Sequence, residues 1–550
     1  MPQITWSEPT SIRINSMQSR QAVHIIAAEW RWVIIVASGL ILLAFAPLVW
    51  MALTGTSEWQ FMGALHNYLD GATYLSKIVQ GERGLWVTFF QHTSETYPGA
   101  FLQGLYPLLG HIARVMSVPA VVIFHVARVF AALFMYISLY QLGAAVWTKI
   151  RARRVFFVIA ALGSGLGWLF TPLLQDVSFP DITVPEVYPL YSTFVNVHFP
   201  LTIACLALLA GYFVLAFRPG ADQDLALDRA VPLIALLSLA LAILYPHALI
   251  PFGVAAALFG LFDWRDQGKL SPRLVRFGLA LVLPALPIAV YYALIITYNP
   301  GFAEWNRQNI NPAPAPAALL IGLGIPLLLG LPGFIRGITR FERDGDRLVV
   351  LWLLAILVVM YLPTGAGRRF AVGLMLPIAY FATRAVEDVW ITRINRRVRS
   401  YVFALVIPLM AVSQIFVLFL PVALPALSGD PGTAVGVFLE HDYYVAYDWV
   451  NQHSSSSDVV LASPVVSAWI PGWAETRVVY GHPYETLNAA VKRQQVLDWY
   501  AGTAECSAIL DEYNVRYVLY GPEEVQFGTA PCRDQLNVVA EIGGVTVYAR

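Results

Sequence analysis

The sequence predicts an all-α polytopic membrane bundle of about eleven transmembrane helices, followed by a small α/β domain outside the membrane. Composition is the first observation behind this prediction. Of the 550 residues, 58% are hydrophobic and only 13% are charged, and the mean hydropathy is +0.62. Apolar runs of about 20 residues, long enough to cross a bilayer, then recur up to residue 427. From residue 428 the pattern changes to short strands and helices.

Charge balance removes one class of function at the start. The 35 basic and 35 acidic side chains cancel, so no overall field draws the chain to nucleic acid.

We expect residues 1–31 to form a cytoplasmic N-terminal segment. The apolar run after Trp30 and Trp32 has no small-residue cleavage site before Asp70, which indicates an anchor rather than a removed signal peptide. The mature chain is then expected to begin near Met1.

The positions of the basic residues predict the topology. Basic clusters occupy every second connection, at residues 149–154, 265–276, 336–347 and 384–399, and the positive-inside rule makes those loops cytoplasmic. The loop at residues 176–186 has three acidic residues and no Lys or Arg, as expected on the opposite face. The transmembrane domain, residues 32–427, thus begins inside and ends outside. We expect a multi-pass protein of the cytoplasmic membrane, with residues 428–550 extracytoplasmic.

The first outer segment, residues 54–118, is too long for a simple connection, and its periodicity predicts helices lying on the membrane surface. One helical face is apolar, formed by Leu65, Leu69, Ala72, Leu75 and Val79. The opposite stripe is polar and contains His66, Asp70, Thr73, Lys77 and Gln80. Gly81 is a candidate C-cap, and the stripe is expected to face water or a cavity. An ordinary interfacial helix with solvated side chains explains the same pattern.

Further candidate binding residues lie near the outer membrane edge. The stretch QHTSETYPG brings together His92, Glu95 and Tyr97, as a substrate-facing turn or simply as a polar loop. His198 and His247 lie at outer ends of expected spans, where ionisable groups commonly face a bundle interior or a watery cavity. Each of these two histidines could equally be a satisfied structural residue.

An arginine pair, Arg368 and Arg369, lies at an expected outer edge where the charge rule disfavours it. A guanidinium forks onto phosphate oxygens and stays charged there, so the pair is a candidate phosphate site. Arginines that snorkel to lipid headgroups are the alternative.

Other motifs of the sequence indicate no further site. Asp-x-Asp patterns at residues 222–224 and 344–346 have metal-binding spacing, but both fall in expected cytoplasmic loops and indicate solvated charge. The sequence contains no P-loop, dinucleotide fingerprint, paired CxxC or HExxH. Their absence argues against an ATP-driven pump, a dehydrogenase and a zinc protease. No cofactor is indicated with certainty, and a divalent cation is left open.

In the tail, DVVLAS, TRVVYG, VRYVLYG and the final VVAEIGGVTVYAR predict strands, alternating with helices at residues 443–452, 486–500 and 505–513. Cys205 lies in a membrane run, whereas Cys506 and Cys532 both lie in the tail. If the tail is extracytoplasmic, those two either form a disulfide or remain free, with neither outcome favoured.

The stretches LDGATYLSKIVQG, HTSETYPGAFLQGLYPLLGHIAR and GRRFAVGLMLPIA, and more weakly VVYGHPYET, are similar to segments of bacterial glycosyltransferase-like proteins. With the expected topology, the chain resembles the GT-C superfamily of membrane glycosyltransferases. That resemblance implies an inverting glycosyltransferase (EC 2.4 class) of the cell envelope with a polyprenyl-phosphate sugar donor. Asp70 matches the general base, with a pKa raised by desolvation. Arg368 and Arg369 match a role in holding the phosphate leaving group.

The sequence differs from two related families in known motifs, and one alternative function competes with the glycosyltransferase hypothesis. Gly71 follows Asp70 where protein O-mannosyltransferases carry a Glu, and the tail lacks the WWDYG-type signature of oligosaccharyltransferases, so sugar and acceptor stay open. The competing hypothesis is a non-catalytic or transport protein that binds polyprenyl-phosphate lipids. The absence of an evident internal repeat disfavours transport. A scaffold acting through its tail would leave Asp70 and the arginine pair unexplained. Membrane lipids are expected partners in every case.

Overall fold

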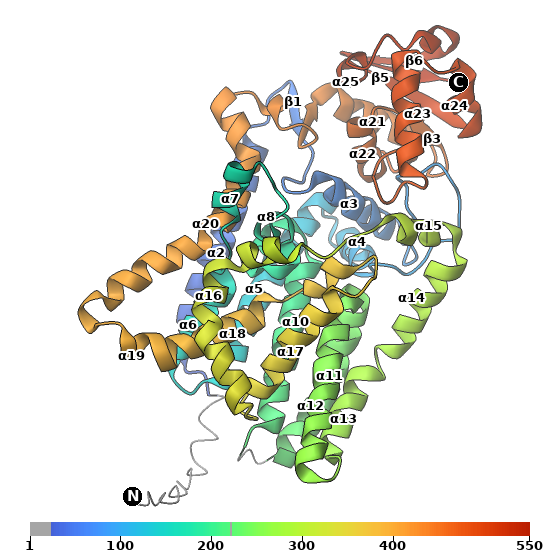
Figure 1. Ribbon diagram of the computed structural model, residues 1–550. Coiled ribbons are helices and arrows are strands. Elements are labelled where there is room, and N and C mark those ends of the chain that lie inside the picture. The colour runs from blue at the N-terminus through green and yellow to red at the C-terminus, as the bar shows by residue number, and fades with distance from the viewer. Residues whose placement is uncertain (1–23, 220–222) are drawn as a thin grey trace, which may run out of the picture.

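The computed structural model describes residues 24–219 and 223–550, which form a helical bundle with a smaller domain at one end (Figure 1). In these ranges nine helical segments are long and apolar enough to cross a membrane. They contain α2 (Ala27–Leu53), α5 (Ala120–Val146), α6 and α7 (Ile150–Leu162, Gly167–Leu174), α10 (His198–Phe217), α12 (Leu249–Gln267), α13 and α14 (Pro272–Val282, Leu286–Tyr298), α16 (Pro316–Arg340), α18 and α19 (Met375–Ala385, Ile391–Arg393), and α20 (Arg396–Ser428). The predicted fold class, a polytopic bundle with a small α/β domain, is confirmed.

The expected count of about eleven spans is not established. Two expected spans fall on α11 (Gln223–Leu244) and α17 (Asp346–Met360). The apolar part of α11, Arg229–Leu244, is shorter than a usual span, and α17 has only 15 residues. Hydropathy located these helices correctly, but it does not decide whether short helices cross the whole bilayer.

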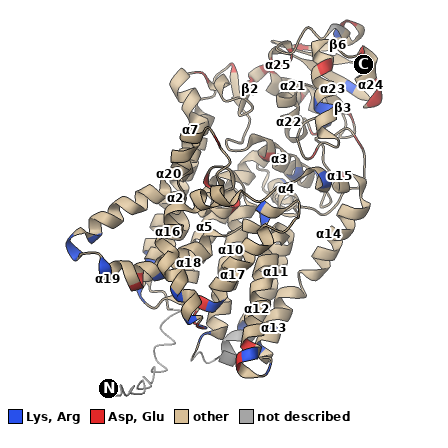
Figure 2. Ribbon diagram, viewed as in Figure 1, with Lys and Arg blue, Asp and Glu red and all other residues tan. Residues whose placement is uncertain are grey.

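Charge is distributed unevenly along the bundle axis. Figure 2 shows Lys and Arg gathered around α19 and the α12–α13 connection, at the end of the bundle opposite the C-terminal domain. At that end Asp346 is fully buried, with Arg336 Nη1 2.5 Å from Oδ2 and Arg384 Nε 3.2 Å from Oδ1. The expectation that this acidic pair is solvated loop charge is therefore wrong for Asp346, which holds α16, α17 and α18 together. Asp222 and the side chain of Asp224 lie outside the described residues.

The first outer segment forms a layer between the bundle and the C-terminal domain (Figure 1). It contains β1 (Trp59–Phe61), α3 (Tyr68–Glu82) and α4 (Leu105–Met116). Gly81 does not cap α3, which continues to Glu82. A Cβ on Gly81 would lie 2.2 Å from the carbonyl oxygen of Pro107, and one on Gly110 would lie 1.9 Å from that of Ile78. These glycines allow α3 and α4 to cross in backbone contact.

Most of the polar residues of α3 that follow Asp70 are buried. Thr73, Lys77 and Gln80 are at most 3% exposed, because α22 (Pro464–Trp473) of the C-terminal domain packs against α3 in a shared apolar core. The expected solvated stripe is thus covered along most of its length. Periodicity identified the stripe, but it carried no signal of the domain that lies over it.

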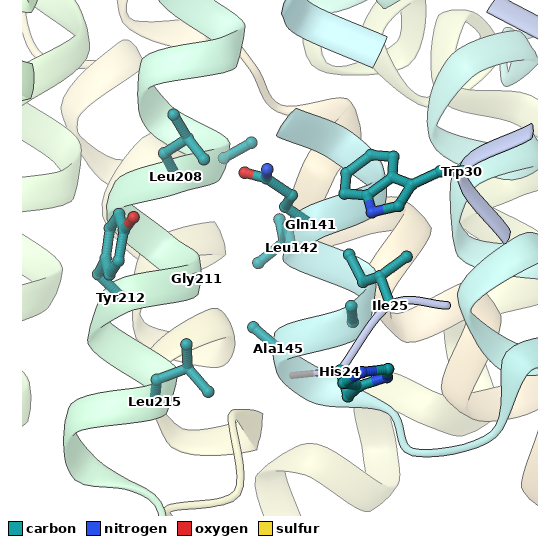
Figure 3. Close-up of a pocket in the computed structure, with 12 residues that line it drawn as sticks. His24, Ile25, Trp30, Gln141, Leu142, Ala145, Leu208, Gly211, Tyr212 and Leu215 are labelled. Carbon is teal, nitrogen blue, oxygen red and sulfur yellow. The ribbon is translucent and has the colours of Figure 1, made fainter. Parts of the chain in front are cut away.

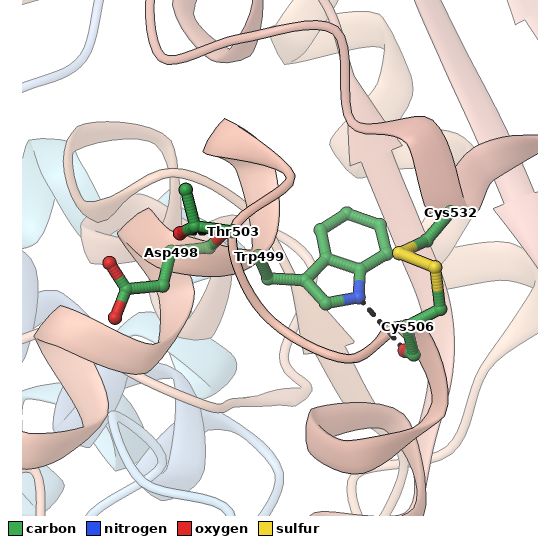
Figure 4. Close-up of a disulfide and its surroundings, with 5 residues drawn as sticks. All are labelled: Asp498, Trp499, Thr503, Cys506 and Cys532. Atoms are coloured by element: carbon green, nitrogen blue, oxygen red, sulfur yellow. Dashed lines mark hydrogen bonds between the residues drawn. A yellow bond between two sulfur atoms is a disulfide. The ribbon is translucent and has the colours of Figure 1, made fainter.

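The C-terminal domain has a five-stranded sheet in the order β4-β3-β5-β7-β6. Its strands are β3 (Val459–Leu461), β4 (Arg477–Val478), β5 (Val515–Tyr520), β6 (Asn537–Ile542) and β7 (Val545–Ala549), and β3 is parallel to both β4 and β5. The predicted helices correspond to α21 (His441–His453), α23 (Ala489–Ala501) and α24 (Cys506–Glu512), whereas α22 was not predicted. Cys506 and Cys532 form a disulfide beside Trp499 (Figure 4), whose Nε1 donates to the Cys506 carbonyl.

The first outer segment and the tail are joined as one unit. Strand β1 pairs antiparallel with β2 (Phe438–Glu440), the first strand after α20. The amide of Val478 in β4 donates to the carbonyl of Gln91. The C-terminal domain is therefore fixed onto the layer that contains Asp70.

Candidate functional site

Asp70 lies in the first turn of α3, where local structure holds its carboxylate. Asn67, the N-cap of that helix, donates from Nδ2 to Asp70 Oδ2 at 2.5 Å. The Asp70 side chain is 39% exposed, unlike the buried residues that follow it on the same face. A carboxylate here also interacts favourably with the N-terminal end of the helix dipole.

His482, from the loop after β4, approaches the other oxygen of Asp70, with Nε2 3.4 Å from Oδ1. The His482 ring is 4% exposed. Its Nδ1 accepts hydrogen bonds from the amides of Tyr484 and Glu485, both at 3.1 Å. An Nδ1 that accepts must be unprotonated, so the neutral ring carries its proton on Nε2, the atom that faces Asp70. The backbone of the C-terminal domain thus fixes the tautomer that can donate to Asp70.

The ionisation of Asp70 differs from the sequence-based expectation. Burial raises the pKa of this carboxyl, but the hydrogen bond from His482 and nearby positive charge outweigh burial, and the net pKa lies below its ordinary value. The expected upward shift is therefore wrong in direction. Asp70 is ionised at neutral pH and can accept a proton.

Asp70 and Arg368 line the same cavity, which has a volume of about 270 Å³. His66 and Asn67 lie beside Asp70 on its wall. Burial lowers the pKa of His66 to about 3, so this ring adds no charge. Apolar residues of α20, namely Val417, Leu420 and Pro421, also line the cavity. One guanidinium, one carboxylate and apolar side chains of a membrane helix thus line the same cavity.

The two adjacent arginines have different environments. Arg368 Nε lies 3.1 Å from Oε1 of Glu186, which is fully buried. Arg369 is not among the residues that line the cavity, and its guanidinium carbon lies 5.8 Å from the centre of the Trp305 ring. Sequence analysis grouped the two residues, whereas the structure assigns only Arg368 to the cavity of Asp70.

Lys77 lies two turns further along α3 and is buried. Its Nζ lies 2.5 Å from Oε1 of Glu485, with exposures of 2% and 8%. His92 Nε2 faces the carbonyl of Ala468 at 3.0 Å, and its Nδ1 lies 3.7 Å from Oε2 of Glu485. Burial lowers the pKa of His92 well below its usual range, so the ring is neutral. Lys77 and His92 therefore fasten the loop at residues 481–486 to the outer layer and do not line the cavity.

The remaining sequence candidates do not line the cavity that contains Asp70. Glu95 pairs with Lys492 at 2.6 Å, and the Tyr97 hydroxyl accepts from the amide of Phe90 at 2.8 Å. His198 Nδ1 contacts the hydroxyl of Tyr106 at 2.7 Å, and the His247 ring centre lies 5.5 Å from that of Phe370. A structural role explains each of these contacts.

A metal ion is not supported by the side chains around this cavity. Among the described residues, no group of three or more His, Cys, Asp or Glu is placed to hold one. Glu186, a buried carboxylate next to the lining residue Pro185, is paired with Arg368.

His482 and Glu186 were missed as site residues by sequence reasoning. Glu186 was visible only as an acidic residue in a loop without Lys or Arg. His482 lies in VVYGHPYET, one of the stretches that carried the resemblance. The contact of His482 with Asp70 depends on how two distant segments pack, which no local pattern records.

Comparison with known proteins supports the fold. Archaeoglobus fulgidus oligosaccharyltransferase, in a structure tethered with an acceptor peptide, has a TM-score of 0.53 and 13% identity over 94% of this chain and 74% of its own. Mycobacterial arabinofuranosyltransferase AftD has a TM-score of 0.54 and 12% identity over 94% of this chain, which spans only 40% of AftD. Both are GT-C-type polytopic membrane glycosyltransferases, so the resemblance is confirmed at the level of fold. No family model and no curated protein matches the sequence.

Proposed function

We propose that this chain is a GT-C-type membrane glycosyltransferase that moves a sugar from a polyprenyl-phosphate donor to an extracytoplasmic acceptor hydroxyl. The observation that carries the proposal is the single cavity lined by Asp70 and Arg368. Glycosyl transfer from a lipid phosphate needs a base for the acceptor and a cation for the leaving phosphate. The basic end of the bundle is assigned to the cytoplasm, which leaves the cavity on the outer side.

In the proposed reaction, the acceptor oxygen attacks the anomeric carbon while its proton passes to a carboxylate oxygen of Asp70. The bond between the anomeric carbon and the phosphate oxygen breaks, and polyprenyl phosphate leaves with the electron pair. Attack opposite the leaving group inverts the anomeric centre. Arg368 donates to the phosphate as its negative charge increases.

His482 and Asn67 are positioning residues in this scheme. Each holds one oxygen of Asp70 through an N–H group, so the carboxylate does not have to be ordered when the acceptor arrives. The apolar residues of α20 that line the cavity, Val417, Leu420 and Pro421, are suited to the first isoprene units of the donor. A neighbouring structure of the Archaeoglobus enzyme is a complex with Zn and sulfate, but this chain's own residues carry each step described here.

The test uses polyprenyl phosphate, the product that is common to every donor sugar. Binding of a short-chain polyprenyl phosphate to the purified protein is measured for the wild type, Arg368→Gln and Arg369→Gln. We expect Arg368→Gln to weaken binding about 10- to 100-fold, because a charge-assisted contact contributes about 1.5–3 kcal/mol. Arg369→Gln is the matched control and should bind like the wild type.

Turnover is followed with lipid-linked sugars extracted from the native membrane, by mass spectrometry of the polyprenyl phosphate released. Release by the wild type and not by Asp70→Asn supports the proposal. Equal binding by the wild type and both arginine variants would contradict it. Normal binding without any turnover by the wild type would favour the competing lipid-binding function.

A further inference from the structure

A second groove is lined by residues of α6, α19 and α20, and α19 lies toward the end of the bundle opposite the C-terminal domain (Figure 1). It has a volume of about 450 Å³ and lies between α6, α16, the segment of η4 (Val386–Trp390) and α19, and the first half of α20. Its wall is mostly apolar and includes Val158, Leu329 and Ile407. Three arginines also line it, namely Arg151, Arg154 and Arg399, and no acidic residue does.

Two of these arginines have no carboxylate partner among the residues that the structure describes. Arg151 forms a bidentate pair with Glu387, at 2.9 and 2.7 Å. Arg154 lies over the Trp32 ring at 4.9 Å, and its buried Nε has no hydrogen-bond partner in the described part of the chain. Arg399 donates only to the carbonyl of Ile391, at 3.3 Å, as far as the described residues show. The groove therefore has uncompensated positive charge beside an apolar wall.

Two other grooves of similar size show that this charge is not a general property of the bundle surface. The groove between α2, α5 and α10, of about 400 Å³, has His24, Gln141 and Tyr212 among its lining residues (Figure 3) but no Lys or Arg. The groove between α12 and α13, of about 410 Å³, is lined without any charged side chain. Ordinary lipid chains suit both of these grooves, whereas the groove between α6 and α20 also fits an anion.

We propose that the groove between α6 and α20 binds one anionic phospholipid, with its phosphate on Arg154 and Arg399 and its acyl chains along Val158, Leu329 and Ile407. Arginine donors pair with phosphate oxygens, and basic pockets between helices on the cytoplasmic side suit anionic headgroups. The bound lipid fills the space between α20 and the bundle. This site is independent of glycosyl transfer and of the cavity that contains Asp70.

The test measures lipid retention on the full-length purified protein. The protein is reconstituted with phosphatidylglycerol and phosphatidylcholine in equal amounts, delipidated in mild detergent, and examined by native mass spectrometry. We expect the wild type to retain one phosphatidylglycerol. The double variant Arg154→Gln with Arg399→Gln should retain at least tenfold less of this lipid. Arg397→Gln is the matched control, because Arg397 is exposed on the same helix and does not line the groove.

A second variant addresses the case in which the double arginine variant fails to fold. Val158→Trp keeps all three arginines and fills the apolar part of the groove, so it should also release the lipid. Equal retention by the wild type, Val158→Trp and Arg397→Gln would show surface lipid only and would overturn the proposal. Equal retention of phosphatidylcholine and phosphatidylglycerol would overturn it as well. Neither result would affect the proposed glycosyltransferase function.

Discussion

The first turn of α3 and its third turn both contact the loop at residues 481–486, and they place charge in opposite environments. In the first turn, Asp70 is 39% exposed and faces His482 at 3.4 Å. In the third turn, Lys77 is 2% exposed and lies 2.5 Å from Glu485. One loop of the C-terminal domain is therefore anchored by a buried ion pair and presents a histidine to an accessible carboxylate. The difference separates a structural contact from a candidate catalytic one on a single helix face.

The variant Asp70→Asn should produce the largest change, and it should act mainly on catalysis. An amide cannot take the acceptor proton, so we expect transfer to fall about 10²- to 10⁴-fold. The melting temperature should fall only slightly, because Asn keeps the shape of Asp and can still accept from His482, although its NH2 group can no longer accept from Asn67. Turnover and thermal unfolding in detergent are measured together. Asp176→Asn, in an exposed outer loop, is the control, and an active Asp70→Asn enzyme would remove the central claim.

Lys77→Met should show the reverse pattern, with a loss of stability as the primary effect. It leaves the Glu485 carboxylate buried without its cation, at a cost of about 3–5 kcal/mol. We expect a clear fall in the melting temperature and weaker docking of the C-terminal domain, read by limited proteolysis. The double variant Lys77→Met with Glu485→Gln should recover most of the stability, because the buried charge is removed. A stable single variant would show that the ion pair does not anchor the loop.

His482→Ala tests the link between the two turns through the pH profile. In the wild type the pKa of Asp70 lies below its ordinary value of about 3.9. Protonation of Asp70 should therefore not reduce activity until the pH falls below that value. Removing the donor leaves burial, which raises the pKa of Asp70. The acid limb of kcat/KM should then move to higher pH, with kcat about tenfold lower at neutral pH from poorer positioning. An unchanged acid limb would show that His482 does not act on Asp70.

The same comparison shows what the sequence could predict. Hydropathy located the bundle, β-rich runs located the strands of the tail, and local patterns selected Asp70 and Arg368. The partners were not predictable, because Lys77 and Glu485 lie 408 residues apart in the chain and pair only when the tail covers α3. Arg368 and Arg369 have the same local context, so only the positions of Glu186 and Trp305 around them distinguish the two.

Thr73→Val should have the smallest effect and locates the boundary between the two environments. Thr73 lies between Asp70 and Lys77, is buried, and donates from Oγ1 to the carbonyl of Asp70 at 3.0 Å. Valine keeps the shape and removes this bond, so we expect about 1 kcal/mol of destabilisation and less than a threefold change in kcat. Unfolding and turnover are compared with those of Asp70→Asn and Lys77→Met. If Thr73→Val instead lowered kcat more than tenfold at unchanged stability, the catalytic environment would extend beyond the first turn of α3, because a backbone contact would then be orienting the Asp70 carboxylate.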